Sequence, residues 1–321
     1  MLYGVCLFFA IRQDVREICS FTSFSEKCYT KLRICAGTHL PCAQKPKHYL
    51  PGGGCILYTI KNYHFAESVD EAAALLQKSR ANTVLGGGTW LRLGERNIAT
   101  AIDLSHLGLD QITETEEEIT LGAMVSLRAL EQSTLLQSQF GGLLARCVRH
   151  IVGVQFRGLA TVGASVASRY GFSDVITALL ALDTEVELCP GGRLPLAAYL
   201  QQPPARQLLV AVHIKKDGCT AVHTSHRLTE TDFPVLAVAA ARCKDGSFRI
   251  SVGARPAVAQ RCQQAEQAAE ANGPEAAGEA AAEMLQFGSN TRGSAEYRKV
   301  LAKVLVTRAL TELAEKESLA R

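Results

Sequence analysis

Two short loops of small residues are the parts of this sequence best suited to chemistry. The first, Gly86-Gly87-Gly88-Thr89, comes directly after the apolar run at residues 83–85. The second, Thr161-Val162-Gly163-Ala164-Ser165, is followed by a lone acid, Asp174. Small residues let the backbone come close to a ligand, and consecutive N–H groups in such turns bind anions. The two loops together suggest one extended, phosphate-containing ligand held from two sides.

The elements around the first loop are predicted from capping and periodicity. Ser68-Val69-Asp70-Glu71 is a capping box that opens a helix, and residues 83–85 form a strand that delivers the loop. Because this loop does not open a helix in a GxGxxG pattern, we do not predict a Rossmann site. Further strands are expected at residues 100–104 and 119–122. A helix is expected from Ser126 to Leu136, with another running to about His150.

The second loop leads into a helix and then into strands. The helix begins at Phe172-Ser173-Asp174 and ends at Leu182. Alternating apolar residues predict strands at 184–188 and 207–214, with a hairpin turn at Gly191-Gly192. The later segments are expected to be an antiparallel sheet of residues 221–227, 235–243 and 248–252, alanine-rich helices at 257–271 and 275–285, and a last helix capped by Ser294. These elements predict an α+β protein with a domain at residues 58–218 and a smaller sheet-plus-helix domain at 219–321.

Composition excludes several classes of partner. The chain of 321 residues has a net charge of +3 and 20% charged residues, which favours neither nucleic acid nor an acidic membrane surface. No apolar run approaches the length of a membrane span. Cysteines from Cys147 onward are scattered singly, as in cytosolic proteins, so we expect a cytoplasmic location and no metal site.

Residues 1–57 differ from the rest of the sequence. They hold six of the 11 cysteines and lack amphipathic periodicity. We expect this segment to be a non-native N-terminal extension, with Leu57 as the true start, or a disordered cysteine-rich segment. A small metal or iron–sulfur module is the alternative, but the cysteine spacings match neither zinc knuckles nor close-packed cluster motifs.

The two loops and their surroundings resemble a known family. The second loop lies in Gln155-Phe156-Arg157-Gly158-Leu159-Ala160-Thr161-Val162-Gly163-Ala164-Ser165, Asp174 follows, and then comes Leu179-Leu180-Ala181-Leu182-Asp183. Arg292-Gly293-Ser294-Ala295-Glu296-Tyr297-Arg298 is similar to the family's closing motif R-G-S-x-x-Y-R. This combination resembles the FAD-binding subunit of the molybdenum hydroxylases, the xanthine dehydrogenase family. The resemblance covers about residues 58–313.

The resemblance implies a fold and a cofactor site. The fold would be a two-subdomain PCMH-type FAD-binding domain followed by a C-terminal domain of the CO dehydrogenase flavoprotein type. FAD would be held without a covalent bond, since the first loop contains no His. By resemblance, the residues expected to contact FAD are Val84, Leu85, Gly86, Gly87, Gly88, Thr89, Trp90, Leu91, Ile151, Thr161, Val162, Gly163, Ala164, Ser165, Asp174 and Leu209.

The resemblance also implies an electron-transfer role within a complex. FAD would receive electrons from iron–sulfur clusters on a partner and deliver them to NAD or another acceptor. The expected partners are a large molybdopterin-binding subunit, which hydroxylates the substrate, and a [2Fe-2S] subunit or domain. We expect no catalytic side chain in this chain itself.

Several positions leave alternatives open. Asp174 suits a ribityl hydroxyl and also, as a helix N-terminal acid, the helix dipole. Ile151 and Leu209 fit core packing as well as flavin contact. Trp90 replaces the family's acid, and Ala164 and Ser165 replace its Gly and Asn. Because of these departures, two further hypotheses stay open. One is a scaffold subunit that has lost its flavin, and the other is a stand-alone FAD oxidoreductase of the same superfamily.

Overall fold

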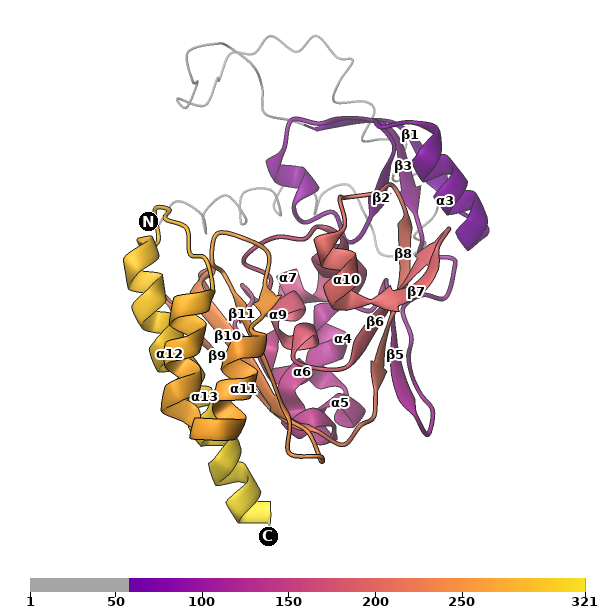
Figure 1. Cartoon of the computed structure of the whole chain (residues 1–321). Helices are drawn as coiled ribbons and strands as arrows, with labels where there is room; N and C mark the ends of the chain where they lie inside the picture. The colour runs from indigo at the N-terminus through magenta and orange to yellow at the C-terminus, as the bar shows by residue number, and fades with distance from the viewer. Residues whose placement is uncertain (1–57, 321) are drawn as a thin grey trace. The chain divides into compact units, whose positions relative to one another are not determined.

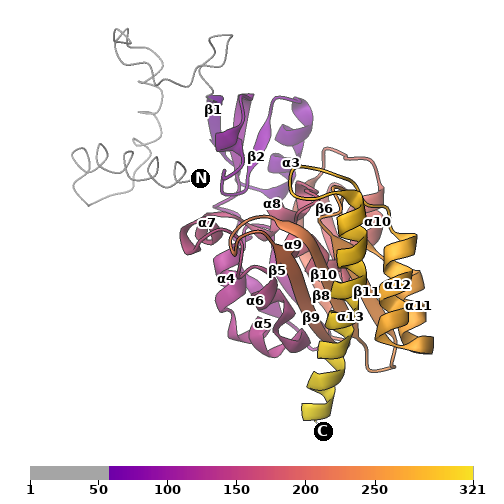
Figure 2. The same ribbon diagram turned by 90° about the vertical axis from the view of Figure 1, so that its left-hand side faces the viewer.

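The structure, a computed structural model, describes residues 58–320. The predicted N-terminal extension at residues 1–57 lies outside the described residues. Three sheets and the helices between and around them make up the described part, and Figures 1 and 2 show them from two directions. The predicted α+β class is confirmed. Within residues 58–320, no helix combines the length and the apolar character that crossing a membrane requires.

The first loop directly follows a strand of a small parallel sheet. Its strands are β1 (Thr59–Phe65), β3 (Asn97–Asp103) and β2 (Thr83–Leu85), in the order β1-β3-β2. Helix α3 (Val69–Lys78) packs beside them. Ser68 caps it by accepting a hydrogen bond of 3.1 Å from the N–H of Glu71. The Glu71 side chain accepts from the N–H of Glu67 at 2.7 Å, so it too helps to fix the start of the helix.

An antiparallel sheet of five strands forms the second layer. Their order is β4-β5-β8-β6-β7, and their bounds are β4 Ile112–Glu114, β5 Glu118–Gly122, β6 Thr184–Cys189, β7 Gly192–Pro195 and β8 Leu208–Lys215. Strand β6 alternates between buried and partly exposed residues, as a strand with one covered face should. The predicted hairpin at Gly191 and Gly192 joins β6 to β7.

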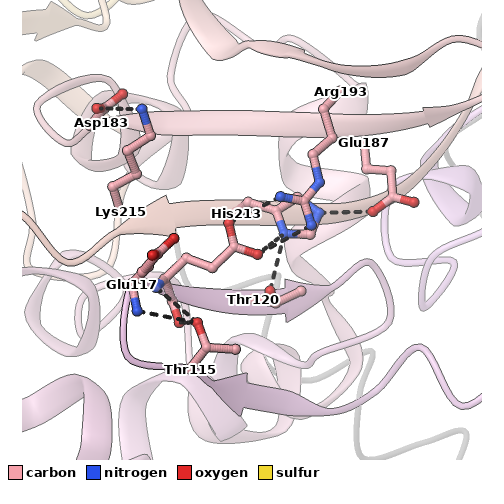
Figure 3. A network of polar contacts seen from close by, with 9 residues as sticks. Thr115, Glu117, Thr120, Asp183, Glu187, Arg193, His213 and Lys215 are labelled. Carbon is pink, nitrogen blue, oxygen red and sulfur yellow. Dashed lines mark hydrogen bonds and ion pairs between the residues drawn. The ribbon is translucent and has the colours of Figure 1, made fainter.

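The other face of this sheet carries a polar network around His213, which Figure 3 shows from close by. The imidazole is 4% exposed; Nδ1 lies 3.0 Å from Thr120 Oγ1, and Nε2 lies 2.8 Å from Glu187 Oε2. Arg193 donates two hydrogen bonds, of 3.0 and 3.2 Å, to Glu118. These bonds hold the pKa of the Glu118 carboxyl below its usual range despite partial burial. The network therefore joins β5, β8, β6 and β7 side by side.

Short helices cover the inner face of the five-stranded sheet. They are α4 (Leu127–Gln132), α5 (Thr134–Ser138), η3 (Phe140–Gly142), α6 (Leu143–Cys147), α7 (Val154–Leu159), α8 (Val162–Ala167) and α9 (Asp174–Leu180), while α10 (Leu196–Gln201) follows β7. The prediction of a single helix from Ser126 to Leu136 was wrong. Ser133 divides it, because its hydroxyl accepts from the N–H of Leu136 and caps a second helix. The next helix ends at Cys147, before His150.

The C-terminal domain is a four-stranded antiparallel sheet with three helices on one face. Its order is β12-β11-β10-β9, with bounds β9 Thr220–Arg227, β10 Pro234–Arg242, β11 Phe248–Gly253 and β12 Gln260–Arg261. The helices α11 (Gln263–Asn272), α12 (Pro274–Met284) and α13 (Ala295–Ala320) lie together on its outer face (Figure 1). The helix predicted from residue 257 begins only at Gln263, because Gln260 and Arg261 pair with β11 instead.

Strand β10 packs against elements of both domains, one on each of its faces. Leu236, Val238 and Ala240 face the C-terminal helices, whereas Ala239 and Ala241 belong to the core shared with α9. All but the last of its residues are buried, which is why its sequence is apolar almost throughout. Small residues face α9, and the Ser251 hydroxyl of β11 donates a 2.6 Å hydrogen bond to the carbonyl of Thr177. The sheet therefore fits closely against the helix that follows the second loop.

Candidate functional site

The first loop presents backbone donors that the protein does not use. Gly87 and Gly88 adopt left-handed backbone angles, with φ of +82° and +67°. The N–H groups of Gly87, Gly88 and Thr89 donate to no acceptor among residues 58–320. Consecutive N–H groups on a turn of this kind form a concave site for an anion. The first loop therefore has a geometry suited to a phosphate, and its contact with FAD stays a prediction.

The structure brings the two loops into contact. A Cβ on Gly86 would lie 2.6 Å from Cβ of Ala164 and 3.0 Å from Oγ1 of Thr161. A Cβ on Gly87 would lie 1.7 Å from the carbonyl oxygen of Leu159. Only glycine permits this approach. The extra methyl of Ala164, where the related pattern has glycine, is accommodated because Gly86 has no side chain.

The second loop has fewer open N–H groups than the first. Four of its five N–H groups have acceptors within the chain: Val162 donates to Val125 O and Gly163 to Ala123 O, each at 2.9 Å. Ala164 and Ser165 donate to the Thr161 hydroxyl and carbonyl oxygens. These bonds start helix α8 and fix it to the chain after β5. The second loop therefore supports the first loop, and of its five residues Thr161 alone has an N–H that donates to no acceptor among residues 58–320. Its contact with FAD stays a prediction.

Asp174 lies at the start of α9, where the sequence placed it, but it already has a partner. Its carboxylate, 3% exposed, accepts a 2.7 Å hydrogen bond from Arg227 of β9. Nε2 of His223, also on β9, lies 3.4 Å from the same oxygen. Asp174 thus joins the loop domain to the C-terminal domain, and its contact with a ribityl hydroxyl stays a prediction. Sequence reasoning missed Arg227, because no local pattern connects β9 with α9.

Trp90 lies in an aromatic cluster formed with Tyr170, Phe172 and Phe233. Its ring centroid is 5.4 Å from those of Tyr170 and Phe172 and 5.7 Å from that of Phe233. The cluster joins the end of the first loop to the segment before α9 and to the turn between β9 and β10. Trp90 therefore fills a gap between segments, one of its two predicted roles. Its stacking on a cofactor stays a prediction.

The other predicted contact residues differ in burial. Leu209 is 4% exposed and packs in the main core, which supports its core role. Ile151 is partly buried against the same core. Val84 packs on the smaller core beside α3, and Leu85 and Leu91 are partly buried. Of these residues, Ile151 lies in the segment that leads to the second loop. All five side chains are apolar.

Arg157 fixes the segment that contains Ile151. Its buried guanidinium donates to Glu131 at 2.9 and 3.1 Å and to the carbonyl of Ile151 at 3.1 Å. Arg128 donates to the same carboxylate at 2.7 Å. Burial raises the pKa of Glu131, but the hydrogen bonds from Arg128 and Arg157 outweigh it and hold the pKa of this carboxyl below its usual range. The network therefore depends on an ionised Glu131.

Glu131→Gln is expected to destabilise the protein near neutral pH by about 2–3 kcal/mol, since charged hydrogen bonds are lost. A carboxyl with a lowered folded-state pKa stabilises the fold fully above its unfolded pKa. That contribution is lost as pH falls through the lowered value. The difference in Tm between wild type and E131Q should therefore narrow below pH 4.5. Thermal unfolding from pH 7 to 3.5 checks this, with E283Q at an exposed position as control. A constant difference would contradict it.

Exposed apolar side chains gather around the two loops. They belong to the loops or their flanking segments: Trp90, Leu93, Val152, Val154, Leu159 and Tyr170. An apolar surface beside free N–H donors suits a ligand with both a phosphate and an aromatic ring system. These observations fit FAD, with Gly87, Gly88 and Thr89 at the pyrophosphate.

Family comparisons match both halves of the described chain. Residues 58–215 match the model of the FAD binding domain in molybdopterin dehydrogenase, and residues 221–313 match that of the CO dehydrogenase flavoprotein C-terminal domain. The chain is 28% identical over 278 residues to the nicotine 6-hydroxylase medium subunit of Paenarthrobacter nicotinovorans. That alignment covers 78% of this chain and 96% of the relative.

Solved structures show the same fold. A carbon monoxide dehydrogenase chain from Hydrogenophaga pseudoflava, in an enzyme lacking the Mo-pyranopterin moiety, superposes with a TM-score of 0.71 at 24% identity. The match covers 78% of this chain and 96% of that chain. A chain of a cyanide-inactivated Cu,Mo-CO dehydrogenase gives 0.73 at 22% identity, covering 80% of this chain and 98% of its own.

Proposed function

We propose, since this chain belongs to the FAD-binding medium subunits of the molybdenum hydroxylase family, that it is the electron-transfer subunit of a molybdopterin-dependent hydroxylase or dehydrogenase. The observation that carries this proposal is the first loop. Its three unused N–H donors, at Gly87, Gly88 and Thr89, lie against the second loop and beside exposed apolar side chains. FAD, when bound, supplies hydride and single-electron chemistry.

The chain's own residues supply position and polarity. Gly87, Gly88 and Thr89 would hold the pyrophosphate through their N–H groups, and Thr161 supports them from the second loop. The exposed apolar residues would exclude water from the ring system. Arg157 fixes the segment of Ile151 that would border it.

The partners are inferred from the family to which the chain belongs. We propose a [2Fe-2S] subunit or domain as donor and a large molybdopterin subunit as the site of substrate oxidation. The proposed acceptor is NAD or another oxidant. The relative from Paenarthrobacter is itself named a medium subunit.

Affinity purification of the tagged chain from its native cells tests this proposal. The expected result is a complex that contains flavin, iron and molybdenum, together with two further subunits or one fused partner. Bound flavin should be reduced when the complex receives its substrate, but not when the isolated chain does. A monomer without iron or molybdenum that turns over a substrate alone would favour the stand-alone oxidoreductase instead.

The flavin-free scaffold remains the second candidate, and the Trp90 cluster is the observation that favours it. Trp90 is held by three aromatic rings of the chain itself and replaces an acid of the family pattern. The absorbance spectrum of the chain expressed from Leu57, purified with and without added FAD, separates the two. Flavin bands support the electron-transfer subunit, and a folded colourless chain that ignores FAD supports the scaffold.

A further inference from the structure

A second pocket lies where the chain before α9 meets the C-terminal domain. It has a volume of ≈ 400 Å³, and its walls include Arg169, Phe172, Phe233, Val258, Asn290 and Arg292. The N–H of Ala254 donates a 2.7 Å hydrogen bond to the carbonyl of Gly171 and closes the junction. No residue of the two small-residue loops lines this pocket. We call it the arginine pocket. It adjoins the first-loop site, because Trp90 packs on its Phe172 and Phe233.

Two guanidinium groups in the arginine pocket are only partly used. Arg292 donates to Asp232 at 3.1 Å, and its buried Nε has no hydrogen-bond partner in the described part of the chain. Arg169 donates to the carbonyl of Gln202 at 2.6 Å and stacks on the ring of Tyr199. The other side-chain N–H groups of Arg169 and Arg292 donate to no acceptor among residues 58–320. Such planar, multiple donors are well suited to carboxylate and phosphate groups.

Two further arginines behind the walls lack a carboxylate partner. Arg255 is 5% exposed and donates only to the carbonyls of Gln286 and Val258 and to the Gln260 side chain. Arg298 is 1% exposed and donates only to carbonyl groups and to Oδ1 of Asn290. Burial lowers the pKa of each guanidinium.

The charges around the arginine pocket are therefore unbalanced. Buried charges without an opposite partner are costly, and a bound anion offsets that cost. Asp232 is the single carboxylate paired with any of the four arginines in the described residues. The loops at residues 254–258 and 290–292 thus carry a positive potential into the pocket. This potential favours an anionic ligand over a neutral or cationic one.

Another part of the lining of the arginine pocket is aromatic and apolar. The rings of Phe172 and Phe233 lie 4.4 Å apart at 51°, and Arg292 lies over the ring of Phe233. Val258 extends this apolar surface. The volume is at the lower end of the roughly 300–1,000 Å³ usual for ligand sites, so a small molecule or one end of a longer one would fill it.

We propose that the arginine pocket binds a small organic anion, whose carboxylate or phosphate pairs with Arg169 and Arg292 and whose planar ring lies against Phe172 and Phe233. The anion has two possible sources, an aromatic carboxylate or the phosphate of a nucleotide. The proposal does not depend on the flavin function.

Trp90 provides the readout, because it is the only tryptophan of the chain and contacts both pocket phenylalanines. The full chain is titrated with benzoate, AMP and inorganic phosphate, by fluorescence and in parallel by calorimetry. We expect saturable binding of benzoate or AMP, stronger than that of phosphate alone. The stronger of the two identifies the source. Binding should weaken about tenfold in Arg169→Gln and in Arg292→Gln, and less in Arg292→Lys.

Controls separate this pocket from the first loop and from misfolding. Arg193→Gln, which removes an arginine paired with Glu118 on a distant strand, should leave binding unchanged. Gly87→Ala, which disturbs the first loop and hence the Trp90 signal, should leave the affinity measured by calorimetry unchanged, whereas AMP bound at the first loop would be lost. Thermal unfolding confirms that each variant is folded. The proposal is overturned if no probe binds up to millimolar concentration, if folded Arg169→Gln and Arg292→Gln bind as wild type does, or if phosphate binds as strongly as benzoate and AMP.

Discussion

Replacing Gly87 by alanine is expected to remove tight FAD binding while the protein still folds. The new Cβ would lie 1.7 Å from the carbonyl oxygen of Leu159, a backbone atom that cannot rotate away. The left-handed backbone at Gly87, with φ of +82°, adds roughly 1–2 kcal/mol for any residue with a Cβ. The first loop must therefore move away from the second loop, and the N–H groups of Gly87, Gly88 and Thr89 lose their alignment. We expect FAD affinity to fall at least tenfold, about 1.4 kcal/mol.

Gly108→Ala is the matched control for Gly87→Ala. Gly108 has φ of +66° in a turn away from the loops, and a Cβ there would meet nothing within 4 Å. It therefore carries the same backbone cost without the collision. Thermal unfolding should show a smaller loss of stability in Gly108→Ala than in Gly87→Ala, and FAD titration by absorbance should show a loss of flavin only in Gly87→Ala. Full flavin binding by Gly87→Ala would refute the first loop as the cofactor site.

Local sequence signals predicted most of the elements correctly. Capping at Ser68, the alternation in residues 184–188 and the turn at Gly191-Gly192 all depend on neighbouring residues, and each is present. The errors arose where tertiary contacts or a second cap decided the outcome. Ser133 divides a helix that its apolar pattern made continuous. Gln260 joins β11, although the alanine-rich sequence around it favours a helix.

The candidate site was predicted less completely than the fold. Glycines in loops mark sites of close approach, so the two loops could be recognised from sequence. The sequence could not show which N–H groups stay without an acceptor, because Val162 and Gly163 donate theirs to carbonyls of the distant residues Val125 and Ala123. The arginine pocket was missed for the same reason, since Arg169 and Arg292 meet only through packing of the two domains.

Asp174→Asn is expected to destabilise the protein more strongly than Glu131→Gln does. Asp174 and Arg227 form a buried ion pair of 2.7 Å between the two domains, with side chains 3% and 7% exposed. Removing one charge leaves the other buried without its partner, at a cost of roughly 3–5 kcal/mol. For a protein of this size, that loss lowers Tm by about 10 °C. Asp183→Asn, which breaks the exposed pair with Lys215, should cost no more than about 1 kcal/mol.

The double variant Asp174→Asn with Arg227→Met tests whether Asp174 also contacts FAD. Removing both charges should recover part of the lost stability, because no unpaired ion remains buried. If the carboxylate also accepts a ribityl hydroxyl, FAD affinity stays low in the double variant although Tm rises. If Asp174 only joins the domains, FAD affinity recovers together with Tm. Measuring FAD affinity and Tm on the same samples therefore separates the ligand role of Asp174 from its structural role. If Asp174→Asn alone is as stable as wild type, the ion pair makes no major contribution to the stability of the fold.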